Sequence, residues 1–260
     1  MKPKVYFTRE LVPEKLIDLY EATGKKLTGN VALKLHSGEE GNQNFLPPAF
    51  FAPVIGHVGG TVVECNTAYD GARNETKKHL KLLEMHGWSR FFKVDLMDAE
   101  GPDAVLEIPN GKVIRKDYVG KDLLNYDSLL VLSHFKGHPM GGYGGALKQL
   151  SIGIASSFGK AYIHGAGNPA EIWTADHDRF LESMADAASA VVAHFGGNAV
   201  YLNVMKNLSV DCDCCAVAED PCMKDIGMLA SLDPVAIDRA CLDLVYASDD
   251  PGRAHFLIAV

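Results

Sequence analysis

The chain alternates short apolar segments with amphipathic ones, and this alternation constrains its fold more than any other feature. Apolar runs of strand length begin near residues 30, 60, 91, 127, 198 and 226, and helical patterns such as 13–24 and 175–195 lie between them. Strands joined through helical crossovers form parallel sheets that are covered on both sides. We therefore predict an α/β fold, a mostly parallel sheet with helices on both faces. The acidic residues on the helix at 175–195 are expected to form a solvated face: Asp178, Glu182 and Asp186.

Residues 103–116 interrupt this alternation. Two apolar runs flank Asn110 and Gly111, a pair that is typical of tight turns between antiparallel strands. The segment predicts a small β-hairpin near 103–116. With 260 residues, 47% of them hydrophobic, the chain can bury a sizeable core without disulfides or metals. We expect a single α/β domain over 1–260, or two lobes in intimate contact.

The charge of the chain excludes several classes of partner. The net charge is -8 at pH 7, and no cluster of lysine and arginine stands out, whereas nucleic-acid binders need a basic face. Nucleic acid and anionic membranes are therefore not expected as partners. No apolar run approaches the ~18 residues of a membrane span, and the first residues lack the apolar core of a secretion signal. We expect a cytoplasmic protein.

Residues 133–167 are unusually rich in glycine and follow the apolar run at 127–132. Nine glycines lie between 137 and 167, against about two at the ~7% average usage, so the backbone must turn tightly or approach something closely. The segment also presents imidazole and ammonium groups, and such groups beyond the end of a strand suit a ligand site of an open α/β sheet. The residues of interest are His134, Lys136, His138, Lys148 and His164.

Two familiar motifs do not explain this segment. Lys148 is preceded by leucine and followed by glutamine, which does not fit the phosphate-binding P-loop. His134 and His138 have the spacing of a helical zinc pair, but Gly137 and Pro139 disfavour a helix there. Any one of these histidines could equally be a satisfied polar residue. The cluster as a whole favours a functional site.

Polar residues also follow the strands predicted near 30 and 60. Lys34 lies inside an apolar strand, where its burial would require a carboxylate or an anionic ligand. Glu64, Asn66 and Arg73 follow the next strand and precede a helix, a position from which side chains can meet an anion. A solvated face for Lys34 and ordinary helix capping for the second loop remain alternatives. We consider these four residues as candidate cofactor-binding groups.

Four of the six cysteines crowd into residues 212–222. Thiolates are ligands for soft metals and for iron–sulfur clusters, so we consider Cys212, Cys214 and Cys222 as metal ligands. Their spacing matches neither the paired zinc motif nor the ferredoxin run. Buried apolar packing and a redox-labile surface loop are the other interpretations.

Three segments of the chain resemble a known family. SHFKGHPMGGYGGALKQLSIGIASS, NVMKNLSVDCDC and GMLASLDPVAID are similar to the family catalogued as domain of unknown function 362 (DUF362), over most of the chain. Several members of that family carry ferredoxin-type cluster motifs. This chain has only the short cysteine patch in place of the long ferredoxin insert.

A more distant resemblance is to the nickel-pincer lactate racemases. In those enzymes a His, a Lys and a second His follow in order, and His138, Lys148 and His164 stand here with separations of ten and sixteen residues. The resemblance implies that Lys148 is covalently attached to the nickel cofactor, that His164 ligates the metal and that His138 acts as acid or base.

Two functions follow as hypotheses. The first is a metal-dependent enzyme of redox or isomerisation chemistry that acts on a small anionic metabolite, with His134 and His138 as proton carriers and Lys148 as cofactor or substrate anchor. Its metal would be nickel or another transition metal, with His164 among the ligands. The alternative is an iron–sulfur or metal-binding module that exchanges electrons with a redox partner protein.

The two clusters are expected to share one cleft. Both follow apolar strands, and the carboxyl ends of parallel strands emerge at the same edge of a sheet. We predict that Cys212 or Cys214 lies within ~15 Å, about one domain radius, of His138 or Lys148. Glu64 or Asn66 should lie on the same side of the sheet.

Overall fold

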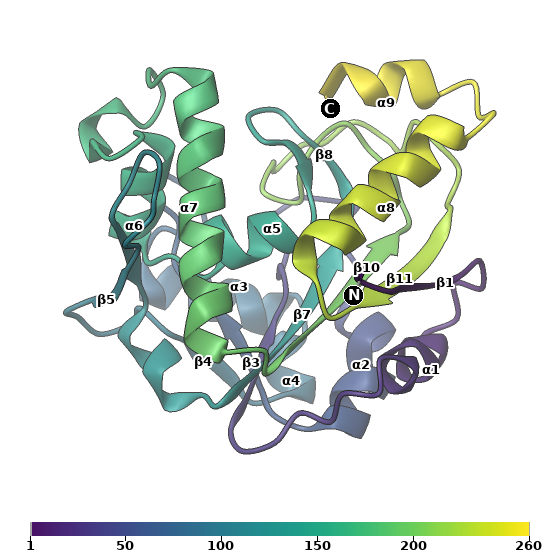
Figure 1. Cartoon of the computed structure of the whole chain (residues 1–260), viewed down its shortest axis with the longest axis horizontal. Coiled ribbons are helices and arrows are strands. Elements are labelled where there is room, and N and C mark those ends of the chain that lie inside the picture. The colour runs from purple at the N-terminus through teal and green to yellow at the C-terminus, as the bar shows by residue number, and fades with distance from the viewer. Residues whose placement is uncertain (1, 260) are drawn as a thin grey trace.

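The computed structural model describes residues 2–259 and contains a seven-stranded sheet between layers of helices (Figure 1). In spatial order the strands are β1 (Val5–Thr8), β11 (Gly227–Ser231), β10 (Ala199–Met205), β7 (Ser128–His134), β2 (Val31–Lys34), β3 (Thr61–Glu64) and β4 (Val94–Leu96). The pairs from β10 to β4 are parallel, and β11 runs antiparallel to both of its neighbours. The predicted α/β fold with a mostly parallel sheet is confirmed. The edge strand β1 was not predicted, because only four residues form it and none is fully buried.

Helices pack on both faces of the sheet, because the central strands are apolar on both sides. Leu130 and Leu132 of β7 belong to one core, and Leu129 and Val131 belong to the other. The first core contains residues of α1 (Lys15–Ala22), α2 (Pro48–Val58), α3 (Thr76–Met85) and α4 (Trp88–Phe91). The second contains residues of α5 (Ala146–Lys148), α7 (His177–Phe195), α8 (Pro234–Ala247) and α9 (Arg253–Ala259). Such two-sided burial explains the continuous apolar runs of the sequence.

Within residues 2–259, no helix combines the length and the apolar character needed to cross a membrane.

The predicted hairpin is present, but its turn is longer than expected. β5 (Ala104–Glu107) pairs antiparallel with β6 (Lys116–Val119) as a separate two-stranded sheet. The connection spans residues 108–115, so Asn110 and Gly111 do not form a two-residue turn. The carboxylate of Asp186, on α7, accepts backbone N–H groups of Val113 and Ile114 at 2.7 and 3.0 Å. Asp186 is therefore buried against this loop and does not belong to the solvated face predicted for it.

The order of the strands places a crevice beside β2. From β2 the chain moves outward through β3 to β4, and it then returns to the other side of β2 to form β7 and later β10. Neighbouring connections diverge at such a switch point, which opens a ligand crevice at the carboxyl ends of the strands. The glycine-rich segment and the cysteine patch both follow strands that end there, β7 and β10.

The glycine-rich segment forms a small hairpin followed by a short helix. β8 (Lys136–His138) pairs with β9 (Gly142–Gly144), and α5 continues into a π-helical turn, η2 (Gln149–Gly153). The helix predicted to be absent at 134–138 is indeed absent. At Gly137 a Cβ atom would lie 2.4 Å from the carbonyl oxygen of Val210. Glycine there lets the chain before the cysteines approach β8 closely.

The remaining short elements complete the region beside the crevice. The 3-10 turn η1 (Lys121–Asn125) precedes β7, and η3 (Pro169–Glu171) follows α6 (Ser157–His164).

Candidate active site

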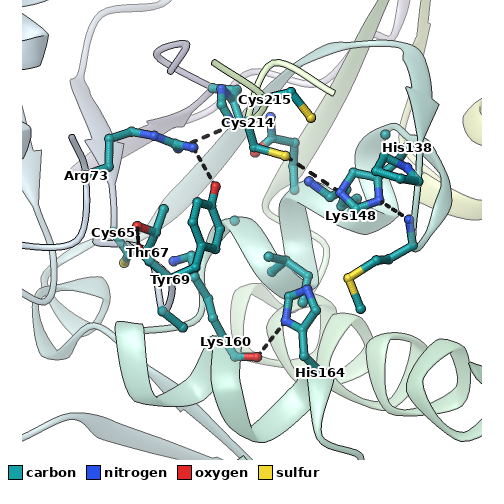
Figure 2. Close-up of a pocket in the computed structure, with 18 of the residues that line it drawn as sticks. Cys65, Thr67, Tyr69, Arg73, His138, Lys148, Lys160, His164, Cys214 and Cys215 are labelled. Carbon is teal, nitrogen blue, oxygen red and sulfur yellow. Dashed lines mark hydrogen bonds between the residues drawn. The ribbon is translucent and has the colours of Figure 1, made fainter. Parts of the chain in front are cut away.

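A cavity of about 280 Å³ lies at the carboxyl ends of the strands and contains most of the candidate residues (Figure 2). Its walls combine histidines, thiols and cationic side chains with an apolar portion. The polar lining includes Lys34, His36, Glu64, Tyr69, Arg73, His134, Lys136, His138, Lys148, Lys160, His164, Cys214 and Cys215. The cavity is at the small end of the range for ligand sites, ~300–1,000 Å³, and suits a small molecule.

The cysteine patch and the glycine-rich segment meet in this cavity, as predicted. The Nζ of Lys148 lies 3.5 Å from the Sγ of Cys212, and the Sγ of Cys214 lies 3.9 Å from the Nε2 of His138. The sulfurs of Cys212 and Cys214 and a ring nitrogen of His138 all lie within 4.8 Å of one another. Glu64 lines the same cavity. The two clusters therefore form one site.

The surroundings of Cys212 favour its thiolate form. Burial raises the pKa of its thiol, but a hydrogen bond from the Cys214 thiol and the positive charge of Lys148 lower that pKa well below its ordinary value. The backbone N–H of Cys214 also points at the Cys212 sulfur, at 3.3 Å. A cysteine in such surroundings is a metal ligand or a nucleophile at neutral pH.

His138 presents a protonated Nε2 to the sulfurs. Its Nδ1 accepts the backbone N–H groups of Met140 and Gly141, at 3.2 and 2.8 Å. Because Nδ1 accepts, the neutral ring must carry its proton on Nε2. Burial and the charge of Lys148 lower the pKa of His138, which favours this neutral form. The arrangement suits a proton donor better than a metal ligand, since a ligating histidine normally donates from its other nitrogen.

His164 has the opposite tautomer. Its Nδ1 lies 2.7 Å from the carbonyl oxygen of Lys160 (Figure 2), so Nδ1 carries the proton and Nε2 keeps its lone pair. Burial lowers the pKa of His164 to about 4, and the hydrogen bond to Lys160 only partly opposes this. A neutral imidazole with its N–H fixed by a carbonyl is the usual form of a metal-binding histidine. The ring also stacks on Phe180, with centroids 4.9 Å apart.

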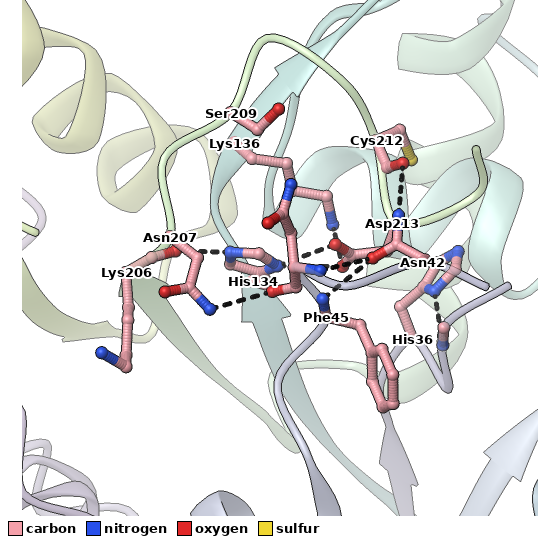
Figure 3. A network of polar contacts seen from close by, with 12 residues as sticks. His36, Asn42, Phe45, His134, Lys136, Lys206, Asn207, Ser209, Cys212 and Asp213 are labelled. Atoms are coloured by element: carbon pink, nitrogen blue, oxygen red, sulfur yellow. Dashed lines mark hydrogen bonds and ion pairs between the residues drawn. The ribbon is translucent and has the colours of Figure 1, made fainter. Parts of the chain in front are cut away.

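His134 lies in a buried network that forms part of the cavity wall (Figure 3). Its Nδ1 is 3.0 Å from both carboxylate oxygens of Asp213, and its Nε2 is 2.5 Å from the carbonyl oxygen of Lys206. Both neighbours are acceptors, so both ring nitrogens must carry protons. Lys136 donates to the same carboxylate at 2.7 Å. With both nitrogens engaged in this way, His134 is less suited than His138 to the role of proton carrier expected from the sequence.

Asp213 ties the cysteine loop to the rest of the site. Burial raises the pKa of its carboxyl, but the charges of His134 and Lys136 and the hydrogen bond from His134 overcome this and lower it. Asp213 stands between Cys212 and Cys214 in the sequence, so its two ion pairs fix the position of both thiols. The spacing of the cysteines gives no indication of a role for Asp213. The sequence signal for this residue is its position between Cys212 and Cys214.

The loop after β2 holds the cysteine loop from the other side. The backbone N–H of Glu39 donates to the carbonyl oxygen of Asp213 at 2.8 Å. The side-chain amide of Asn42 donates to the carbonyl oxygen of Cys215 at 2.8 Å, and that of Asn44 donates to Glu219 at 2.7 Å. These contacts join segments that are 173 and 175 residues apart.

Lys34 and Glu64 form a buried ion pair in the cavity wall, with Nζ and Oε2 2.5 Å apart. Burial raises the pKa of Glu64, but the ammonium of Lys34 overcomes this and holds that pKa well below its ordinary range. Burial lowers the pKa of Lys34. The lysine predicted to need a counter-charge therefore has one from the protein.

Arg73 also lines the cavity, with its donors already engaged. Its Nε donates to Glu39 at 3.0 Å, and its Nη2 donates to the hydroxyl of Tyr69 at 3.0 Å. Asn66 lies outside the cavity, in a shallow neighbouring hollow. There its side-chain amide donates to Thr76 at 3.1 Å.

Cys222 is not brought to the cavity. Its sulfur donates to the carbonyl oxygen of Leu208 at 3.4 Å. Two lining residues that the sequence did not single out are Lys160 and Trp173. Lys160 stands one helical turn before His164, a spacing that could have drawn attention to it. Trp173 lies in an irregular segment that gives no such signal.

The fold and the site define an α/β protein with a ligand cavity at the switch point of its sheet. A family model described as domain of unknown function (DUF362) matches residues 31–243. The chain belongs to this family.

Two solved structures are similar to this chain at low sequence identity. A crystal structure of a protein from Thermotoga maritima superimposes with a TM-score of 0.53 and 14% identity, over 91% of this chain and 59% of that one. The lactate racemase apoprotein from Thermoanaerobacterium thermosaccharolyticum is similar with a TM-score of 0.46 and 14% identity, over 76% of this chain and 50% of that one. The chain thus spans about three fifths and one half of these proteins. No curated protein matches it.

Proposed function

We propose that this protein is a metal-dependent enzyme that acts on a small anionic metabolite. The observation that carries the proposal is the convergence of two cysteine sulfurs and the His138 ring within 4.8 Å, with Cys214 and His138 lining a cavity with cationic walls and Cys212 buried directly behind them. Structural cysteines are usually inert and lie in apolar surroundings. Here Cys212 instead faces an ammonium group and a histidine.

The donor set fits a soft transition metal. Cys212 and Cys214 would hold it through their sulfurs, since thiolates prefer such metals. His164 offers a further nitrogen in the same cavity, with a free lone pair on Nε2. Such a metal would supply a redox centre or a Lewis acid that polarises a bound oxygen.

The protein's own residues would bind the substrate and move its proton. His138 holds a proton on Nε2, beside the sulfurs, and can deliver it to a substrate atom in the cavity or take one back. Lys148 and Lys160 would attract a carboxylate or a similar anion. Redox and isomerisation chemistry both remain within this proposal.

The resemblance to nickel-pincer enzymes adds a narrower version, in which Lys148 is the covalent anchor of the cofactor and His164 a nickel ligand. The neutral, carbonyl-bound form of His164 supports the second role. Intact-mass analysis of protein isolated from its native host tests the first. A Lys148 without added mass would rule out the covalent anchor and leave the metal-dependent enzyme standing.

The main test is metal binding by Cys212. Anaerobically purified protein is stripped of metal and titrated with nickel or cobalt, and thiolate-to-metal absorption bands are followed. Loss of one ligand should exceed the ~10–100-fold effect of changing a residue behind a ligand, so Cys212→Ser should weaken binding by about a hundredfold or more. Cys222→Ser is the matched control and should change nothing. Equal affinity in wild type and Cys212→Ser would remove the proposed metal site.

An iron–sulfur module is the second candidate, because a third thiol, Cys215, also lines the cavity. Near-stoichiometric iron and sulfide in anaerobically purified protein would favour this function. Bound nickel without sulfide would favour the enzyme.

A further inference from the structure

The mouth of the cavity is apolar and carries an exposed tryptophan. The side chain of Trp173 is 64% exposed, although tryptophan is usually largely buried. It lines the cavity together with Met140, Ile152 and Ile172. Its ring lies 6.4 Å from that of Tyr69, at an interplanar angle of 53°. The two rings are not stacked on one another, and the exposed ring of Trp173 is accessible to a flat apolar group.

The cations deeper in the cavity are of two kinds. Carboxylates of the protein already neutralise three of them: Lys34 by Glu64, Arg73 by Glu39 and Lys136 by Asp213. Among residues 2–259, no carboxylate lies within ion-pair distance of the two others, Lys148 and Lys160. Lys148 faces the sulfur of Cys212, so the cation of the cavity without an ion-pair partner among these residues is Lys160.

Lys160 is the better placed of the two to bind an anion. It is buried, and its ammonium donates one hydrogen bond, to the carbonyl oxygen of Ala155 at 2.5 Å. An ammonium has three donors, so two are left. Lys148 already contacts the thiolate of Cys212 at 3.5 Å. If a metal takes that thiolate, Lys148 also becomes available to an anion.

We propose that the ligand of this cavity is an aromatic carboxylate. Its carboxylate binds Lys160, with Lys148 as second partner, and its ring lies against Trp173 and Tyr69 at the mouth. Any reaction of this ligand rests on the proposed function, whereas its binding is inferred from the cavity alone. It narrows the small anionic metabolite of that proposal to acids that carry a flat apolar body.

The charge count and the size of the cavity disfavour a polyphosphate. Lys160, joined by Lys148 when a metal takes the sulfur of Cys212, balances one or two negative charges, and ~280 Å³ leaves little room beyond a single ring and its acid group. An apolar mouth would also contribute nothing to a small hydrophilic acid. The burial of an aromatic ring and its contact with Trp173 stabilise the complex through both apolar area and ring geometry.

Binding can be measured directly, because the chain contains only two tryptophans. Trp88 is fully buried, and its indole N–H donates to Ser37 at 3.0 Å, so a ligand-dependent change of fluorescence reports Trp173. The full-length protein is titrated by fluorescence and by calorimetry, before and after loading with nickel. The probes are 3-phenylpropanoate, propanoate and 3-phenylpropanamide.

We expect 3-phenylpropanoate to bind at least about tenfold more tightly than the other two probes. Trp173→Ala should weaken it roughly tenfold and abolish the fluorescence change without affecting propanoate. Lys160→Met should weaken both acids. The controls Tyr246→Ala and Lys77→Met, which alter an exposed aromatic residue and an exposed lysine outside the cavity, should bind like wild type.

Two results overturn the inference: equal affinity for 3-phenylpropanoate and propanoate, or unchanged affinity in Trp173→Ala. Its failure is distinguishable from failure of the proposed function. Nickel bound through Cys212 without affinity for the aromatic acid removes the substrate class alone. Affinity for the aromatic acid without a metal site removes the metal-dependent enzyme alone.

Discussion

Two groups of buried polar residues lie side by side in this protein, and they differ in how completely their hydrogen bonds are satisfied. In the network of His134, Lys136 and Asp213, both ring nitrogens and the shared carboxylate have close partners. Elsewhere in the lining of the same cavity, His164 keeps a free lone pair, and within residues 2–259 the ammonium of Lys148 has only a sulfur as partner. Satisfied buried groups fix a structure, whereas unsatisfied ones in a cavity are available to a ligand.

The comparison separates residues that the sequence had grouped together. His134 and His138 are four positions apart and were given the same role. The first is locked between two acceptors, and the second holds its proton toward the sulfurs. Proximity in the chain is therefore a poor guide to role, and the partners of each ring nitrogen are a better one.

The largest expected effect follows from removing the shared carboxylate. Asp213→Asn would leave the charges of His134 and Lys136 buried without a counter-charge, so we expect the free energy of unfolding to fall by about 3–5 kcal/mol. Urea denaturation measures it. Glu182→Gln, which breaks an exposed ion pair with Lys112, is the control and should cost less than about 1 kcal/mol. Similar losses of unfolding free energy in both variants would show that the buried network stabilises the fold no more than an exposed ion pair does.

A second test concerns Asp117 of β6, a buried carboxyl outside both groups. Neither of its oxygens has a hydrogen-bond partner among the described residues, and burial raises its pKa to about 7, with the charge of Lys160 only partly opposing this. Between about pH 4 and 7 the folded state keeps a proton that the unfolded chain has lost. The free energy of unfolding should therefore fall as pH rises through this window, by about 4 kcal/mol in total.

Asp117→Asn should remove that pH dependence, because the amide does not titrate. The variant should be more stable than wild type at pH 8 and similar to it near pH 4, as measured by urea denaturation at both values. Asp249→Asn, at an exposed position, is the control. A wild-type protein with the same stability across the window would show that Asp117 has a partner in solution.

The smallest effect is expected in the cavity itself. Lys148→Met removes a positive charge beside Cys212, so the pKa of that thiol should rise toward its ordinary value. The thiolate absorption in the ultraviolet, followed against pH and corrected with Cys212→Ser, measures the shift. The fold should tolerate the change, since Lys148 has no carboxylate partner to leave unpaired. If Cys212 titrates in Lys148→Met as it does in wild type, its lowered pKa is caused by the hydrogen bonds from His138 and Cys214 and not by Lys148.

The central strands of the sheet could be predicted because each one is marked by an apolar run within its own segment of the sequence. Residues 127–132 are a continuous apolar run, and both faces of β7 proved to be buried. The edge strand β1 lacks such a signal. Asp186 was misassigned because its partners, the N–H groups near Ile114, lie 72 residues away, and a helical pattern cannot show them.

The site was predictable in its location and less so in its roles. The strand ends correctly placed Cys212 and Cys214 near His138 and Lys148. The function of each histidine depends on distant acceptors, such as Asp213, which lies 79 residues from His134. No local pattern encodes that choice. Trp173 lies in an irregular segment, and its place at the mouth follows only from the packing of α6.

The contacts between the loop after β2 and the cysteine loop also bear on the stage of folding at which the site forms. Asn42 and Asn44 are synthesised early, and the carbonyl groups that they bind follow 173 and 175 residues later. Contacts of such long range form late in folding, because the intervening chain must first be ordered. The thiols therefore acquire their arrangement only after β10 has joined the sheet. If the proposed metal binds here, its retention should therefore depend on the contacts between these two distant loops.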